Sequence, residues 1–457
     1  MLPPAEHLLI FARLPEPGKT KTRLIDAFGT QRAAVLYRAL AQHTLDMARR
    51  FASQRGCNLT TCFSGGSAGA MAAEFGGEND YREQQGDDLG SRLIHAIHQA
   101  FSRGAERVVV LGTDCHELDE QRLTQAFDAL RRNSNSAGIH SGNKFASCDV
   151  VLGPALDGGY YLIGVNQPQS LLFEGIEWGT NQVLDQTKLK AREAGLRCAE
   201  LSPLSDIDYP EDVISMRSER AGFSGELFRV QPGRLSIVLP TLNEAGQLLQ
   251  TLQAIGSPSE QLEIIVADGG SRDRTLDIAK ECGCQTLKVP RGRGAQMNAG
   301  AAVSTGETLL FLHADTRLPS EYCTAVEDCL AAGHVAGAFR LGITGQRLGM
   351  RLVEYGANLR SRWLQMPYGD QALFMRANTF FNLGGFGRLP IMEDFELVAR
   401  LRRTGRIGLI WQPVATSGRR WQKHGILKTT AINQLCLLAY RLGISPQRIA
   451  NFYRRQD

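Results

Sequence analysis

The chain has 457 residues, 43% of them hydrophobic and 21% charged, and a formal net charge of +4. This length exceeds what one ordinary hydrophobic core supports, so we expect two or three domains. The small net charge does not point to a polyanionic partner, and no recognised nucleic-acid-binding motif accompanies the basic residues, so we expect no nucleic acid to bind.

The ten cysteines are scattered and show no paired zinc spacing. With no secretory leader ahead of them, they indicate reduced thiols and a cytoplasmic protein. No run of eighteen apolar residues predicts a membrane-spanning helix. Residues 426–444 have a helical period and are moderately apolar. They predict a packed helix, with weak peripheral contact with a membrane as the less favoured alternative.

The chain divides at residues 216–233, a polar, Gly-rich stretch that we interpret as a linker between residues 1–215 and 234–457. Short apolar runs, polar turns and amphipathic helices alternate on both sides. The runs that predict strands are HLLIFAR, RVVVLGTD, DVVLGPALDGGYYLIGV, RLSIVLPTLNEA, LEIIVADGGSRDRT and TLLFLHADT. This alternation predicts two α/β domains, each a mostly parallel sheet flanked by helices, with ligand sites at the carboxyl ends of the strands.

The first predicted strand is followed by LPEPGKTKTRL, residues 14–24. Its Gly18-Lys19-Thr20 step is similar to the end of a Walker A loop. Arg13 occupies the position of the first Walker glycine, however, and the two prolines remove backbone donors. The loop is therefore no P-loop, but a strand, a loop with glycine and cations, and a helix start still favour phosphate binding.

Further acidic positions follow in the first half. They are Asp88 in QGDDLGSRL, Asp114 in VVVLGTDC, Asp157 before Gly158 and Gly159, and Asp206 and Asp208 in DIDYPEDV. The alternatives are a solvated turn before Pro210 for the last pair and a tight hairpin for the two glycines.

These motifs resemble the first type of radical-SAM/selenodomain-associated transferase over residues 5–215. That family is similar to GT-A-fold nucleotidyltransferases of the phospholactate guanylyltransferase group. The resemblance implies a triphosphate grip that holds an NTP, with a divalent metal, Mg²⁺ or Mn²⁺. The implied grip consists of Gly18, Lys19, Lys21 and Arg23, with Lys19 and Arg23 as catalytic cations; Asp88, Asp157, Gly158 and Gly159 bind substrate, and Asp114 and Asp208 bind the metal. His116 stands where the family usually has a proline.

Four clusters in the second half each follow a predicted strand or open a helix. They are PTLNE at residues 240–244, DGGSRD at 268–273, HAD at 313–315 and Glu393-Asp394. A single aspartate at such a place is often only a helix cap. Four clusters in this order favour a nucleotide and metal site instead.

From about residue 235 to 453 the chain resembles inverting family 2 glycosyltransferases of the GT-A fold. The motifs that carry the resemblance are SIVLPTLNE, ADGGSRDRT, RGRGAQMNAGA, FLHADT, GDQALFMR and IMEDFELVARLRR. Within these, the chain is most similar to the second type of radical-SAM/selenodomain-associated transferase, also labelled an arsenosugar-biosynthesis glycosyltransferase. The resemblance implies Asp394 as general base. It also implies metal ligands Asp315 and His313; nucleotide contacts from Pro240, Asn243, Glu244, Asp268, Arg293 and Asn298; and an acceptor pocket and clamp from Gly369, Asp370, Gln371, Arg419, Arg420 and Trp421.

The leading hypothesis is a fused two-enzyme chain. Its second half would transfer a sugar from a nucleotide sugar to a small-molecule acceptor, and its first half could make that donor, which would raise the local concentration of the shared intermediate. Two alternatives remain for the first half. It could be a kinase or NTPase that uses Gly18-Lys19-Thr20 with Asp114, or a non-catalytic nucleotide-binding or scaffolding domain.

Overall fold

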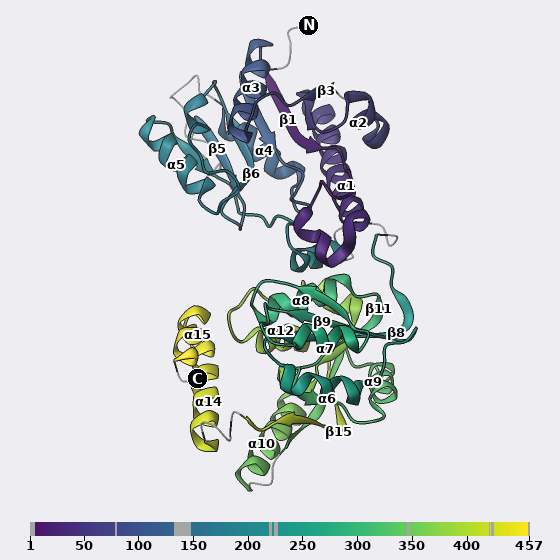
Figure 1. Ribbon diagram of the computed structural model, residues 1–457. Coiled ribbons are helices and arrows are strands. Elements are labelled where there is room, and N and C mark those ends of the chain that lie inside the picture. Colours follow the sequence, from purple (N-terminus) through teal and green to yellow (C-terminus); the bar gives the residue numbers. More distant parts are fainter. Residues whose placement is uncertain are drawn as a thin grey trace. The chain divides into compact units, whose positions relative to one another are not determined.

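The computed structural model describes residues 5–77, 80–131, 148–218, 222–223, 227–344, 348–419, 421 and 425–455. The chain forms two compact units, Met1–Asp208 and Tyr209–Asp457 (Figure 1). The division precedes the predicted linker because the 3₁₀ helix η2 (Pro210–Arg217) packs on helix α8 (Arg293–Val303) of the second unit. Arg217 donates hydrogen bonds from Nη1 to the carbonyl oxygens of Ala301, Ala302 and Ser304. Residues 209–215, assigned above to the first half, therefore lie in the second unit.

The first unit is a seven-stranded sheet in the order β3-β2-β1-β4-β6-β5-β7. Strands β3, β2, β1 and β4 are parallel to one another, and so are β5 and β7. Strand β6 runs antiparallel to its neighbours β4 and β5. Its elements are β1 (Glu6–Arg13), α1 (Thr22–Arg55), β2 (Asn58–Ser64), α2 (Ala68–Phe75), β3 (Asp80–Glu83), α3 (Leu89–Ser102), β4 (Arg107–Leu111), α4 (Glu120–Ala129), β5 (Val150–Pro154), β6 (Tyr160–Val165), η1 (Ser170–Leu172), α5 (Val183–Glu193) and β7 (Cys198–Glu200).

Alternation along β1 sends successive side chains to opposite faces of the sheet, and each face has its own helices. Leu8 and Ile10 pack with α1, α2 and α4 in one buried cluster. Leu9 packs with α3 and α5 in the other. Since both faces are covered, the strands are apolar throughout, as is typical of α/β sheets.

The second unit is an eight-stranded sheet in the order β10-β9-β8-β11-β14-β13-β15-β12. After η2 its elements are β8 (Gln231–Thr241), α6 (Ala245–Ile255), β9 (Leu262–Asp268), α7 (Thr275–Glu281), β10 (Gln285–Lys288), α8, β11 (Gly306–Phe311), β12 (Thr316–Arg317), α9 (Tyr322–Ala331), β13 (Ala336–Thr344), α10 (Leu348–Leu364), η4 (Gly369–Gln371), β14 (Phe374–Arg376), α11 (Ala377–Asn382), α12 (Glu393–Thr404), β15 (Ile407–Ser417), α14 (Ile426–Arg441) and α15 (Pro446–Arg454).

Helices α6, α7 and α9 cover one face of this sheet, where Ile237 and Leu239 of β8 are buried with them. On the other face α8 approaches β8 closely, and Phe311 of β11 contacts the rings of Phe380 and Phe386. The carboxyl ends of β8, β9 and β11 carry the acidic motifs, so the sheet gathers them at one edge.

The two sheets share one strand order. Omitting β12, the order β10-β9-β8-β11-β14-β13-β15 repeats the order and strand directions of β3-β2-β1-β4-β6-β5-β7. In both sheets one strand, β6 or β14, is antiparallel to its two neighbours. It lies between four parallel strands on one side and a pair of parallel strands on the other. This confirms the predicted fold class, two GT-A-like α/β domains with mostly parallel sheets flanked by helices.

Gly300 sets how closely α8 approaches β8. A Cβ atom at this position would lie 2.4 Å from Cγ1 of Val238. We expect Gly300→Ala to lower the free energy of unfolding by about 1–3 kcal/mol, because such overpacking forces neighbouring atoms to shift. Chemical denaturation of the full chain measures it. The control is Gly356→Ala in α10, where a Cβ meets nothing within 4 Å. It should be neutral or slightly stabilising, and equal losses in both variants would contradict the packing argument.

Candidate functional sites

Lys21 is the central residue of the first unit's site. It precedes α1 in a left-handed conformation (φ 45°) and its side chain is only 6% exposed. Its Nζ lies 2.6 Å from Oδ1 of Asp114 and 2.9 Å from Oδ1 of Asp208. Burial alone would lower the pKa of Lys21, but the two carboxylates outweigh burial and raise it above its ordinary value. A protonated ammonium therefore bridges the two residues that the sequence predicts as a metal pair.

The other two loop cations differ in their surroundings. Arg23 Nη1 lies 2.8 Å from Oδ2 of Asp208, while Lys19 is 70% exposed and pairs with Glu16 at 2.9 Å. Burial opposes the charge on Asp208, yet the neighbouring Lys21 and Arg23 keep its pKa below the usual range. The role of Lys19 as a catalytic cation stays a prediction, because its exposed ammonium makes only a surface ion pair with Glu16.

A buried carboxyl lies beside this pair. Burial raises the pKa of Asp206 to about 7, and the charges of Asp114 and Asp157 add to the rise. The Cys115 thiol donates a hydrogen bond to Asp206 Oδ1 at 2.5 Å, which opposes it. Cys115 was not singled out from sequence, although it follows Asp114 directly in the GTDC motif.

Two further residues predicted to bind substrate have structural roles. Asp88 caps α3: its Oδ1 accepts a hydrogen bond from the Ser91 amide at 2.7 Å in a capping box. Gly158 has φ 94°, and a Cβ there would lie 2.2 Å from the Asn181 carbonyl oxygen. Only glycine fits this turn. The Asp157 carboxylate accepts a hydrogen bond from the Gly159 amide at 2.9 Å.

In the second unit Asp268 organises the turn after β9. Its side chain is buried and accepts hydrogen bonds from the amides of Gly270 and Ser271 and from the hydroxyls of Thr241 and Ser271. These bonds occupy both carboxylate oxygens. Asp268 thus shapes the loop, and direct contact with a base or ribose, as predicted, would have to displace one of them.

The loop after β8 joins this turn through backbone contacts. Pro240 pairs with Ala267 in the sheet, and Asn243 has a left-handed φ of 56°. The Asn243 amide donates to the Ser271 hydroxyl at 2.7 Å, and Asn243 Oδ1 accepts from the Arg272 amide at 2.8 Å. Sheet pairing and hydrogen bonds therefore hold these two predicted nucleotide-binding segments together at one edge.

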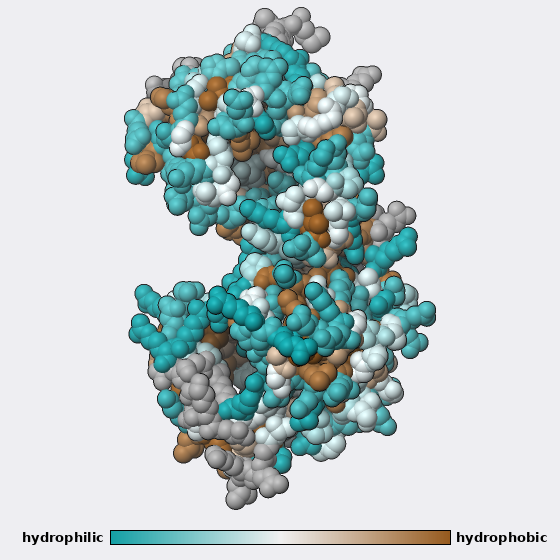
Figure 2. Space-filling model, viewed as in Figure 1, coloured by the Kyte–Doolittle hydropathy of each residue, from teal (hydrophilic) through white to brown (hydrophobic). Residues whose placement is uncertain are grey.

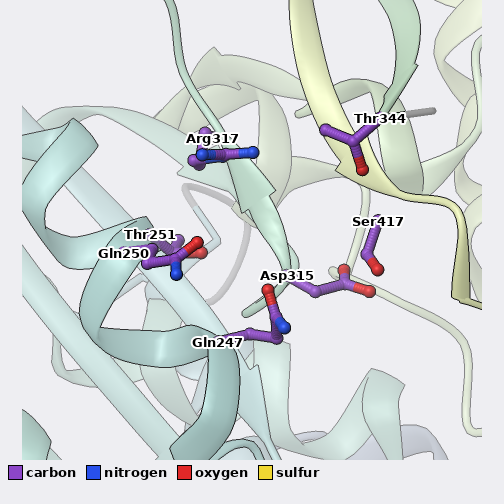
Figure 3. A pocket seen from close by; sticks show the side chains of 7 residues that line it. All are labelled: Gln247, Gln250, Thr251, Asp315, Arg317, Thr344 and Ser417. Carbon is purple, nitrogen blue, oxygen red and sulfur yellow. The ribbon is translucent and has the colours of Figure 1, made fainter. Parts of the chain in front are cut away.

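Asp315 faces a small pocket lined by polar side chains (Figure 3). The lining residues are Gln247, Gln250, Thr251, Asp315, Arg317, Thr344 and Ser417. Arg419 approaches Asp315 Oδ2 at 3.4 Å and Glu244 Oε2 at 3.0 Å. Burial would lower the pKa of Arg419, but these two carboxylates raise it. The first unit has the same arrangement. In each unit an aspartate follows the equivalent strand, β4 or β11, and a basic side chain of the protein links that aspartate to a second carboxylate.

Asp394 lies in a second cluster at the start of α12. Its Oδ2 accepts from the Gly369 amide at 2.8 Å and its Oδ1 from the Phe395 amide at 2.7 Å. A Cβ on Gly369 would lie 3.2 Å from Asp394 Oδ2 and 3.1 Å from Nε2 of His313. The His313 ring and the Asp394 carboxylate therefore face the same small space beside Gly369, where a Cβ would fit only tightly.

One ion pair and two groups with shifted pKa values lie around Asp394. Arg293 Nη1 lies 3.5 Å from Oε1 of buried Glu393. Burial lowers the pKa of His313 to about 3, helped by Arg293, so the ring is neutral. Burial raises the pKa of Asp370 to about 6, with Arg360 opposing and Asp394 adding. Within the described part of the chain, no donor reaches the buried Oδ1 of Asp370.

Three predicted ligand residues are used for packing instead. Both ends of the buried Asn298 amide bond the backbone of Phe386, at 2.9 Å each. Gln371 is fully buried and bonds Ser361 and the Phe339 carbonyl. Trp421 packs against a small cluster that includes Met350. A phosphate contact of Asn298 would have to displace one of its bonds to Phe386. The clamp role of Trp421 stays a prediction, and Arg420 lies outside the described residues.

The fit of a divalent metal differs between the units. In the first, the Lys21 ammonium fills the position between Asp114 and Asp208, so these residues as placed do not form a metal site. In the second, Asp315 adjoins hydroxyl and amide oxygens, the donor types that Mg²⁺ and Mn²⁺ prefer. His313 faces Asp394 rather than completing a ligand set. Over the described ranges, no three or more His, Cys, Asp or Glu side chains group as a metal centre.

The fold and these strand-end sites define a GT-A-like α/β protein. The family described as glycosyl transferase family 2 matches residues 236–389. A second family, described as an uncharacterized protein conserved in bacteria (DUF2064), matches residues 46–180.

A glycosyltransferase of PGL/p-HBAD biosynthesis from Mycobacterium bovis is 38% identical over 228 residues, which are 46% of this chain and 86% of the relative. Through its second half, the chain therefore belongs to glycosyl transferase family 2. The 4,4'-diaponeurosporenoate glycosyltransferase of Staphylococcus haemolyticus is 30% identical over 96 residues, 19% of this chain and 26% of that protein. The chain spans 26% to 61% of the length of this relative and two others, from Bacillus subtilis and Rhizobium meliloti.

One similar solved structure is a Desulfovibrio desulfuricans chain provisionally assigned as a nucleotide-diphospho-sugar transferase. It is 32% identical with a TM-score of 0.42, and the match covers 49% of this chain and 90% of that chain. A second is glucosyl-3-phosphoglycerate synthase of Mycobacterium tuberculosis in complex with Mn²⁺, UDP and glucosyl-3-phosphoglycerate. It is 16% identical with a TM-score of 0.32, and the match covers 47% of this chain and 81% of that chain.

The raised pKa of Asp206 makes stability depend on pH. An unfolded aspartyl ionises near pH 4, but the folded one ionises near 7. Its favourable contribution is therefore complete below about pH 4 and is lost as pH rises toward 7. Asp206→Asn should remove this decline and raise Tm by about 2–5 °C at pH 8. Calorimetry of both proteins at pH 5 and pH 8 measures it. The same pH dependence in the variant would show that Asp206 is not the titrating group.

Proposed function

We propose that the second unit is an inverting glycosyltransferase that transfers a sugar from a nucleotide sugar to a hydroxyl of a small-molecule acceptor. The observation that carries the proposal is the setting of Asp394. Two backbone amides fix its carboxylate, which shares a small space with neutral His313. Nearby Asp370 has a buried oxygen that no donor reaches among the described residues.

Asp394 would act as the general base. Inversion requires that the acceptor hydroxyl attack the anomeric carbon from the face opposite the leaving nucleotide. A carboxylate held by amide donors keeps its orientation while it accepts the hydroxyl proton. His313 and Asp370 would position the acceptor, and Arg293, which opens α8, would face the diphosphate.

A divalent metal, Mg²⁺ or Mn²⁺, would offset the charge of the leaving diphosphate. Asp315 would hold it, with the hydroxyl oxygens of Thr344 and Ser417 nearby. Arg419 would have to leave Asp315 or share it, because its guanidinium now neutralises that carboxylate. The Mn²⁺ in the complex of glucosyl-3-phosphoglycerate synthase is consistent with this cofactor.

The finer resemblance points to a modified small molecule as acceptor. The motifs of both halves are similar to the two types of radical-SAM/selenodomain-associated transferase, and the second type includes arsenosugar-biosynthesis glycosyltransferases.

The test of the base is Asp394→Asn. We expect kcat to fall by about 10²- to 10⁴-fold, because an amide cannot take the proton, while the donor still binds. Transfer assays with a panel of nucleotide sugars, and titration calorimetry with the best donor, measure the two effects. The control is Asp277→Asn, which makes the same change at an exposed position in the first turn of α7. Unchanged turnover in Asp394→Asn would remove it as the base.

For the first unit, a nucleotide-binding role is supported by the shared strand order and by the basic loop before α1. It would be a nucleotidyltransferase in which a phosphate oxygen of a sugar phosphate attacks the α-phosphorus of an NTP. The nucleotide-sugar donor forms and pyrophosphate leaves. Such transfer relies on cations and positioning, and Lys21 and Arg23 are the cations that meet Asp114 and Asp208. The alternative is a domain that binds nucleotide without catalysis.

Asp208→Asn separates these two. If the unit is catalytic, the variant should lose at least about 10²-fold in pyrophosphate release from an NTP and a sugar 1-phosphate, because Arg23 and Lys21 each lose one carboxylate partner. Nucleotide binding to the full chain, measured by calorimetry, should persist. Asp185→Asn, in the first turn of α5, is the control. Binding by the wild-type chain without any turnover would favour the non-catalytic alternative.

A further inference from the structure

Helix α10 exposes an apolar stripe on the side opposite its buried face. Leu352, Tyr355, Leu359 and Trp363 are spaced by three or four residues, and their exposed fractions are 74%, 68%, 44% and 72%. That spacing places them on one face of the helix. The buried residues Met350, Ala357, Asn358 and Ser361 lie on the other. The stripe therefore faces solvent.

Helix α14 repeats this arrangement. Leu427, Ala431, Leu435, Leu438 and Leu442 follow the same three- and four-residue spacing, and Leu427 is 87% exposed. Thr429, Cys436 and Leu437 are the buried residues of the helix. The two helices contact each other: a Cβ on Gly349, near the start of α10, would lie 2.8 Å from Cδ1 of Ile426, the first residue of α14. On the face seen in Figure 2, hydrophobic residues are exposed beside hydrophilic ones.

Basic side chains occur along all three helices, although Arg360 turns inward to the Met366 carbonyl, Gln371 and the Tyr368 ring. Together α10, α14, α15 and the following residue carry eight Lys and Arg side chains and one acidic residue, Glu354; the basic residues are Arg351, Arg360, Arg362, Lys428, Arg441, Arg448, Arg454 and Arg455. On α14, Lys428 and Arg441 lie on opposite sides of the stripe by helical position. The whole chain has a net charge of only +4, so this surface is much more basic than the rest.

We propose that these exposed stripes and their flanking cations, here called the apolar-basic surface, bind a lipid bilayer that contains anionic headgroups. Leucines and aromatic rings would enter the boundary between headgroups and acyl chains, while the cations contact lipid phosphates. None of the described helices is long and apolar enough to cross a membrane, so the contact would be peripheral. A second copy of the chain fits less well, because pairing this face with itself would bring like charges together.

Vesicle co-sedimentation of the full chain tests the proposal. We expect binding to vesicles of phosphatidylcholine with phosphatidylglycerol, less binding to phosphatidylcholine alone, and a decrease at about 1 M salt, where screening is strong. Leu427→Ser, Leu438→Ser and Leu442→Ser combined should weaken partitioning at least about tenfold, because three exposed leucines no longer enter the bilayer. Brominated lipid should quench part of the emission of the four tryptophans, and the quenched part should shrink in Trp363→Phe.

The matched control combines Leu171→Ser with Leu189→Ser, which removes two exposed leucines of the first unit. It should bind vesicles like the wild type, and the circular dichroism of all variants should match. No binding to anionic vesicles, or equal loss in the control, would overturn the proposal. So would a dimer detected by light scattering that only the triple variant dissociates, since the surface would then join two copies of the chain.

Discussion

Parallel strands bring carboxylates together at one edge of each sheet, and the protein has to neutralise them. Both units do so with a cation of their own. Lys21 bridges Asp114 and Asp208, and Arg419 bridges Asp315 and Glu244. Without these contacts the neighbouring negative charges would repel each other and disfavour the folded edge. A metal or a ligand cation that binds at either edge must therefore replace or rearrange an internal one.

The sequence predicted the fold class well because apolar runs and polar turns depend on local pattern. The runs HLLIFAR and TLLFLHADT overlap the core strands β1 and β11. The helix predicted over residues 426–444 is α14, which ends at Arg441. The antiparallel insertion of β6 and β14 was not foreseen, because pairing direction depends on contacts far apart in the chain. Nor did the sequence reveal the common strand order, since the halves show no direct repeat. The boundary moved because Arg217 bonds to the end of α8.

The sites were predicted less completely than the fold. Spacing indicated that Asp114, Asp315 and Asp394 lie at strand ends or a helix start, and they do. Spacing could not show which of these side chains already pair with other groups of the protein. Lys19 and Lys21 look alike in sequence, yet one is a surface residue and the other is buried between two carboxylates. Asn298 and Gln371 are polar residues in a motif, but tertiary packing commits their amides to backbone groups.

The boundary between the units falls directly after a residue of the first site. Asp208, which holds both Lys21 and Arg23, is the last residue of the first unit, and Tyr209 begins the second. The covalent junction and the first site therefore cannot be altered independently. Cleavage or insertion one residue early would detach a charged partner of two cations, even if both cores stayed folded.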